Sequence, residues 1–293
     1  MTLPKGLWYS YIMISSDLNE FRVEAHEFLL GQQKPLPTSA IARRLFGARR
    51  HEMPETQVVV RALLADDPRF VETHDHCWTV LGSPLLRKSL NQATFSVVDL
   101  ETTGSVIGVD EIIEIGLIQV RGGKIIDRFE SLVWTDRAIP PWVARLTGIS
   151  NQDLEGAPTF SDLAETLVGL LESNVFVAHD IRFDLPFLRW EFARRGIGRP
   201  AVTGLCTLQL SRQFWPDLVS RSLPDLAAHF GIDHDNPHRA ADDAAATAGV
   251  LLEVFKEADR LGLVDLGDLY RVEEITAART TDGDSLASRA AES

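Results

Sequence analysis

Apolar and polar residues in the first 82 positions follow the periods of three helices and then of two short strands. Residues 17–31, 36–47 and 54–67 place apolar side chains close to helical spacing, and the first two stretches end at a glycine. Residues 69–82 hold two β-rich runs on either side of the polar turn THDH. Three helices followed by a hairpin predict a small α+β unit of the winged-helix type.

From residue 94 onward the pattern is that of strands and helices in one α/β unit. FSVVDLETTG, residues 95–104, and the stretch 110–133 predict three strands, the last two joined by a Gly-Gly hairpin turn. A further short apolar strand is predicted over 174–179. Helical spacing is found over the stretches 161–173, 186–196, 221–231 and 237–262. This order predicts a mixed sheet flanked by helices.

Charge and composition divide the chain into three segments. Residues 1–90 carry a net charge of +1, and residues 91–256 carry a net charge of −9. Residues 275–293 contain almost no large apolar side chains, which predicts disorder. We therefore expect a winged-helix-like domain over 1–85, an α/β domain over 93–258 and a disordered tail.

The chain of 293 residues has the composition of a globular protein. Its apolar runs and its cysteines bear on membrane association and on the redox compartment. No apolar run approaches the ~18 residues of a membrane span, and residues 7–14 lack a signal-peptide cleavage site, so no membrane association is expected. Cys77 and Cys206 form neither a zinc pattern nor a disulfide framework, which indicates the reducing cytoplasm. The net charge of −13 argues against nonspecific nucleic-acid binding over the whole surface, but bound divalent cations invert such a field locally.

Two carboxylates end the first strand of the α/β unit. Asp99 and Glu101 are two residues apart, so both project from one face of the strand, roughly 7 Å apart in rise. Carboxylates beside an apolar strand are costly unless a cation or hydrogen-bond donors compensate them. Oxygen ligands are those that Mg²⁺ and Mn²⁺ prefer, although two solvated acids at a strand end are the alternative.

Two later helix starts offer further acids and a histidine. Asp184 follows the strand at 174–179 and precedes the helix predicted from Pro186. His238 and Asp243 lie at the opening of the helix predicted from Pro237. Singly, Asp184 is explained as a helix N-cap worth ~1 kcal/mol, and the acids near His238 as favourable charges in a first helical turn. Together, three element ends that each carry an acid indicate one shared site.

The order of these motifs resembles that of the DEDDh family of 3′–5′ exonucleases, the DnaQ-like group that includes the epsilon proofreading subunit of bacterial DNA polymerase III. DLETTG resembles the first motif, HDIRFD the second, and HRAADDA the third, which has the form H-x4-D. EIIEIG and residues 139–150 resemble further stretches of these proteins. The resemblance covers about residues 93–256 and implies a ribonuclease H-like fold.

The resemblance also implies roles for nine residues. The four acids that would hold two divalent ions, Mg²⁺ or Mn²⁺, are Asp99, Glu101, Asp184 and Asp243. His238 would be the general base, and the residues that would contact the substrate are Thr102, Thr103, His179 and Phe183. Two metals serve both ends of an in-line phosphodiester displacement, and histidine accepts a proton near neutral pH. The implied activity is release of nucleoside monophosphates from DNA 3′ ends, in proofreading or repair.

Four positions limit the transfer of these roles. Asp180 and Ile181 stand where the family often has Asn and Ala, and Asp180 adds negative charge near the expected metals. Cys206 stands where many relatives carry Asp and is expected to be a buried structural thiol. Asp242 adjoins Asp243, but the spacing from His238 favours Asp243 as the ligand.

Partners and alternative functions stay open at this level. Two arginine doublets in the first unit could contact DNA phosphates, with a solvated helix face or protein docking as alternatives; they are Arg43, Arg44, Arg49 and Arg50. The expected substrate is single-stranded nucleic acid or a DNA 3′ end. The alternatives are an exonuclease for RNA or short oligonucleotides and a catalytically inert nucleic-acid-binding adaptor. No clamp-binding peptide follows the last predicted helix, so polymerase association has no sequence support.

Overall fold

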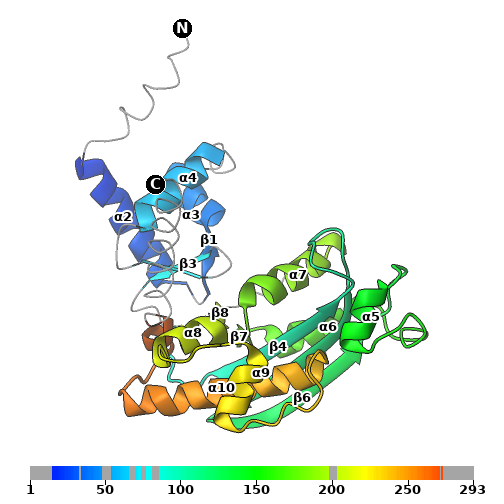
Figure 1. The fold of residues 1–293 in the computed structure, drawn as a ribbon. Coiled ribbons are helices and arrows are strands. Elements are labelled where there is room, and N and C mark those ends of the chain that lie inside the picture. The colour runs from blue at the N-terminus through cyan, green and yellow to red at the C-terminus, as the bar shows by residue number, and fades with distance from the viewer. Residues whose placement is uncertain are drawn as a thin grey trace, which may run out of the picture. The chain divides into compact units, whose positions relative to one another are not determined.

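The computed structural model describes residues 15–32, 34–47, 54–65, 70–73, 77–80, 86–197, 203–270 and 272. The chain divides into two compact units, Met1–Arg87 and Lys88–Ser293 (Figure 1). The apolar stretch 7–14, Arg49, Arg50 and the predicted disordered tail lie outside the described residues. No helix in the described part of the chain is long and apolar enough to cross a membrane.

In its described residues, the first unit combines three helices with a three-stranded antiparallel sheet in the order β1-β3-β2. Its elements are α2 (Ser15–Leu30), β1 (Leu36–Pro37), α3 (Thr38–Phe46), α4 (Pro54–Ala65), β2 (Phe70–Glu72) and β3 (Cys77–Val80). Trp78 is buried among residues of all three helices, and its Nε1 donates a hydrogen bond to Thr38 Oγ1 at 3.0 Å. Three helices followed by two strands were expected; the short strand β1 was not. The winged-helix assignment stays a prediction.

The second unit is built on a five-stranded mixed sheet in the order β6-β5-β4-β7-β8. The strands are β4 (Thr94–Thr102), β5 (Ile112–Arg121), β6 (Lys124–Leu132), β7 (Val175–Ala178) and β8 (Thr203–Cys206). The first three pair antiparallel, whereas β7 and β8 run parallel to β4. The predicted mixed sheet flanked by helices is thereby confirmed.

Helices cover both faces of this sheet (Figure 1). They are α5 (Pro141–Thr147), α6 (Phe160–Leu171), α7 (Ile181–Arg194), α8 (Thr207–Phe214), α9 (Leu223–Phe230) and α10 (Ala240–Arg260). Val98 and Leu100 of β4 belong to the core formed with α6 and α7. Phe95 meets Phe255 of α10 on the other face, with ring centroids 4.8 Å apart. Because side chains alternate along a strand, Asp99 shares the face of Phe95, toward α10.

Two predicted helix starts were wrong because tertiary contacts set them. Helix α7 begins at Ile181, five residues before Pro186, and Ile181 is buried in the sheet core. Asp184 is therefore in the first turn of α7 and is not its N-cap. Helix α10 begins three residues after Pro237, at Ala240, whose backbone N–H donates to the buried Glu114 of β5 at 2.9 Å. The elements β8, α5 and α8 were not predicted.

Gly116 lets α10 approach the sheet closely. It lies opposite Asp99 in the β4–β5 register, and a Cβ at this position would be 2.1 Å from the carbonyl oxygen of Ala240. The close contact is with backbone, which cannot rotate away. The absence of a side chain at Gly116 is therefore what places the first turn of α10 against the end of β4.

Gly116→Ala is expected to destabilise the protein by at least about 1–3 kcal/mol, because the methyl group must displace α10. The free energy of unfolding in urea measures the effect. Gly169→Ala is the matched control: Gly169 lies in α6 with no atom within 4 Å of the added methyl group. It should raise stability by about 0.5–1 kcal/mol through helix propensity. Equal behaviour of the two variants would contradict the close-approach argument.

Candidate metal and catalytic centre

Four carboxylates from three elements converge at the end of β4. Asp99 and Glu101 come from β4, Asp184 from the first turn of α7, and Asp243 from the first turn of α10. Asp184 Oδ1 accepts a hydrogen bond from the backbone N–H of Leu100 at 3.1 Å, which fastens α7 to the strand. One ligand atom from each of Glu101, His238 and Asp243 can be chosen so that all three lie within 4.8 Å of one another.

The carboxylates interact strongly enough to shift one another's pKa. Burial, followed by the charges of Asp184 and Asp243, raises the pKa of Asp99 well above its usual value. Burial also raises the pKa of Asp184, against hydrogen bonds from backbone N–H groups that lower it. The pKa of Glu101 is raised to about 8 by burial and then by Asp243 and Glu114. Such a group of acids suits a cation, because a divalent ion offsets both the cost of burying the carboxylates and their mutual repulsion.

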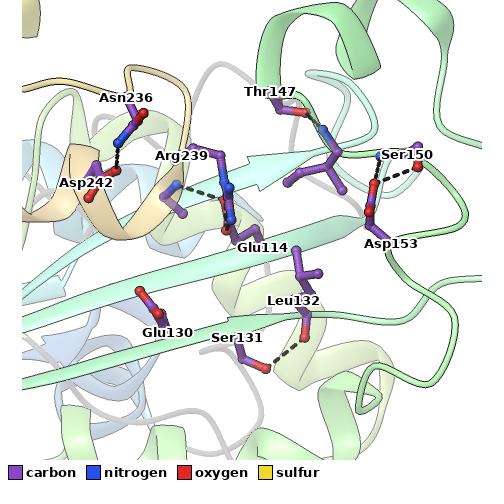
Figure 2. Close-up of polar contacts among 12 residues, drawn as sticks. Glu114, Glu130, Ser131, Leu132, Thr147, Ser150, Asp153, Asn236, Arg239 and Asp242 are labelled. Atoms are coloured by element: carbon purple, nitrogen blue, oxygen red, sulfur yellow. Dashed lines mark hydrogen bonds and ion pairs between the residues drawn. The ribbon is translucent and has the colours of Figure 1, made fainter.

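Glu114 is a further buried acid at the centre that the sequence analysis missed. It faces Glu101 across the β4–β5 register and is 3% exposed. Arg239 neutralises it, with Nη2 at 2.6 Å and Nε at 3.1 Å from Oε1 (Figure 2). Its other oxygen accepts the N–H of Ala240, so Glu114 holds the start of α10. An acid inside the otherwise apolar EIIEIG strand was the available signal.

His238 lies in the loop just before α10, not in the helix. Its backbone has φ 66°, an uncommon value for a residue other than glycine, and its backbone N–H donates to Asp243 Oδ2 at 3.0 Å. The side chain is exposed beside Glu101 and Asp243. This geometry leaves the imidazole accessible to a water molecule or a substrate at the carboxylates.

The four residues expected to contact substrate take up different positions. Thr102 and Thr103 are both buried, and the Thr103 hydroxyl donates to Asp110 Oδ1 at 3.0 Å, which closes the loop after β4. His179 Nε2 donates to the carbonyl oxygen of Arg221 at 3.0 Å, and burial lowers the pKa of His179. Phe183 is half-buried against Phe187, with ring centroids 5.0 Å apart.

The departures from the family motifs are accommodated locally. Asp180 adopts the left-handed conformation at the N-cap of α7, and Arg182 binds both of its oxygens, at 2.7 and 2.9 Å. These hydrogen bonds lower the pKa of Asp180, and the guanidinium balances its charge. Cys206 is buried, as expected of a structural thiol. Asp242 accepts a hydrogen bond from Asn236 at 3.0 Å (Figure 2).

The metal-free protein is expected to lose stability as the pH rises from 4.5 to about 8. Over this window the folded state keeps the Glu101 proton that the unfolded chain releases, so deprotonation favours unfolding. Glu101→Gln should flatten the decline of the thermal unfolding midpoint in EDTA. Glu165→Gln, on the exposed surface of α6, is the control and should leave the slope unchanged. A wild-type slope that Glu101→Gln does not alter would contradict the raised pKa.

The chain matches known proteins over this second unit. Residues 96–251 match the RNase_T family model, described as Exonuclease. The 3′–5′ exonuclease DinG of Staphylococcus epidermidis is 39% identical over 178 residues, which cover 61% of this chain and 20% of that protein. The chain thus matches only about a fifth of the length of such curated relatives.

Solved structures share the fold at low sequence identity. E. coli exonuclease I in complex with a dT13 oligonucleotide is 20% identical with a TM-score of 0.52, over 58% of this chain and 42% of that chain. A 3′-exonuclease described as recognising the 3′ end of the histone mRNA stem-loop is 19% identical with a TM-score of 0.50, over 56% of this chain and 82% of that chain. These similarities show the architecture of the second unit.

Proposed function

The chain belongs to the exonuclease family that matches residues 96–251, and from this premise we propose that it hydrolyses nucleic acid from the 3′ end, one nucleotide at a time. The convergence of four carboxylates and His238 at one end of β4 is the observation that carries the proposal. The donor set is rich in oxygen, as Mg²⁺ and Mn²⁺ prefer. Burial and then mutual repulsion raise the pKa values of Asp99, Glu101 and Asp184, and two such cations would offset both effects.

The carboxylates and His238 have different proposed roles in the hydrolysis. Asp99, Glu101, Asp184 and Asp243 would hold the cations, which when bound supply Lewis acidity and lower the pKa of water. His238 accepts the proton from the attacking water, whose oxygen forms a bond to phosphorus. The bond from phosphorus to the 3′ oxygen of the preceding nucleotide breaks, and that oxygen takes up a proton from solvent. The products are a nucleoside 5′-monophosphate and a strand shortened by one residue with a free 3′ hydroxyl.

Single-stranded DNA or a DNA 3′ end is the proposed substrate, with RNA or short oligonucleotides as the alternative. The similarity to 3′–5′ exonuclease DinG supports a 3′ polarity. Contacts of Thr102, Thr103, His179 and Phe183 with the substrate are part of this proposal, and they would set the terminal nucleotide beside β4 and α7. An inert adaptor is less favoured, because all five expected catalytic residues are present. Glu101, His238 and Asp243 lie together, and Asp184 hydrogen-bonds the strand that carries Asp99 and Glu101.

The test uses 5′-labelled single strands of the same sequence in DNA and in RNA. The full chain with Mg²⁺ should shorten the DNA stepwise and release mononucleotides, and EDTA should stop the reaction. Faster shortening of RNA would transfer the proposal to the alternative substrate. Full activity in EDTA, or no activity on either strand with Mg²⁺ and with Mn²⁺, would overturn the metal-dependent exonuclease.

The first unit is proposed to be a separate winged-helix-like domain over residues 1–85 that contacts DNA or a protein. Arg43 and Arg44 are exposed on α3, and Arg44 also pairs with Glu24 at 3.1 Å. Two exposed arginines on one helix suit phosphate contacts. A role in proofreading or repair is proposed on the family resemblance alone, and a cytoplasmic location on the two cysteines, which form no disulfide framework.

A further inference from the structure

The loop between α9 and α10 is fastened to the first turn of α10 by three hydrogen bonds. The Nε2 atom of His234 bonds Oδ1 of Asp243, and the backbone N–H of His238 donates to Oδ2 of the same carboxylate at 3.0 Å. Asn236 Nδ2 donates to Asp242 Oδ2 at 3.0 Å (Figure 2). Two of the three bonds therefore end on an expected metal ligand, and the third ends on its neighbour.

His234 is built into the protein rather than presented to solvent. Its side chain is only 7% exposed, and that of Asp243 is 11% exposed. An ionised carboxylate only accepts hydrogen bonds, so His234 Nε2 carries the hydrogen in this contact. A buried ring with its donor on a carboxylate fixes the rotation of that carboxylate about its Cβ–Cγ bond.

We propose that His234 is a positioning residue that orients Asp243 for a divalent cation. Each carboxylate oxygen has two acceptor positions, so the donors from His234 and His238 leave one on each oxygen for the ion. Partners behind a metal ligand hold it in its binding orientation, and their loss typically costs 10–100-fold in metal affinity or activity. The inference rests on the proposed function, since it needs a cation at Asp243.

The competing explanation is that His234 only anchors the loop. Asn236 separates the two roles, because it joins the same loop to the same turn of α10 through Asp242 instead of Asp243. If anchoring is all that matters, loss of either side chain has the same consequence. If His234 orients the ligand, only its loss weakens cation binding.

The experiment measures Mn²⁺ binding to the full chain by isothermal titration calorimetry without substrate. His234→Ala is expected to raise the Kd for Mn²⁺ by about 10–100-fold, and His234→Gln, whose amide nitrogen reaches Asp243, should recover much of the affinity. Asn236→Ala should stay within about twofold of wild type, as surface substitutions usually do. The Mg²⁺ concentration that gives half the maximal rate should rank the variants in the same order as the Kd for Mn²⁺, and it should be higher for His234→Ala than for wild type.

An unchanged Kd for His234→Ala, or an equal loss for Asn236→Ala, would overturn the inference. If His234→Ala does not fold, His234→Gln is compared with His234→Asn, whose shorter amide does not reach Asp243; equal Mn²⁺ affinities then overturn it. Wild-type protein that binds no Mn²⁺ would refute the proposed function and this inference with it. Wild-type binding with an unaffected His234→Ala would refute the inference alone.

Discussion

Asp243→Ala is expected to reduce nucleotide release by about 10³-fold or more, because loss of a ligand removes several kcal/mol of charge stabilisation at the reacting phosphate. The fold should survive the change. Asp243 raises the pKa of both Asp99 and Glu101 in the metal-free protein, so its removal relieves repulsion. The change also removes the acceptor of His234 and of the His238 backbone N–H, which opposes this gain, so the thermal unfolding midpoint in EDTA should stay close to that of wild type. Mn²⁺ should no longer raise it fully.

Asp242→Ala is the matched control for Asp243→Ala. The two aspartates are neighbours in the first turn of α10, but Asp242 hydrogen-bonds Asn236 and Arg128 instead of facing the other acids. Its removal should change the rate by no more than about twofold. A large loss of activity in Asp242→Ala with a small one in Asp243→Ala would show that the metal ligand has been assigned to the wrong residue.

His238→Ala is expected to slow the chemical step by about 10²–10⁴-fold, the usual contribution of a positioned general base. The proposed reason is that the exposed imidazole beside Glu101 and Asp243 takes the proton of the attacking water. Substrate and metal binding should be largely kept, because the contact of this residue with Asp243 uses its backbone N–H, which alanine retains. Single-turnover rates at saturating metal measure the chemical step directly.

The pH profile distinguishes His238 from a residue that only positions phosphate. The wild-type rate should fall at acidic pH, because an imidazolium cannot accept a proton, and His238→Ala should lose the part of this dependence that comes from the imidazole. His229→Ala, on the exposed surface of α9, is the control and should keep the wild-type profile. A near-normal rate in His238→Ala would remove the residue from the mechanism.

Local sequence predicted the mixed sheet without its strand β8, and it singled out four acids that the structure brings to one end of β4, Asp99, Glu101, Asp184 and Asp243. The alternation in β4 assigned Asp99 and Glu101 to one face, because side-chain direction in a strand follows from position alone. The spacing of His238 and Asp243 likewise predicted that both residues lie near the start of one helix. These features depend on residues close together in the sequence, so they can be predicted without a structure.

The tertiary structure decided what depends on residues far apart. Glu114 became part of the site only through strand pairing, which sets it opposite Glu101, and through Arg239, 125 positions away. Helix α10 begins at Ala240 and not at Pro237, because Glu114 accepts a hydrogen bond from the backbone N–H of Ala240. Pro237 alone predicted an earlier start of the helix. His234 gave no signal in the sequence, since a histidine in a polar loop has no period or motif to mark it. Such contacts depend on how closely helix and sheet approach, and the lack of a side chain at Gly116 is what allows the close approach of α10 to β5.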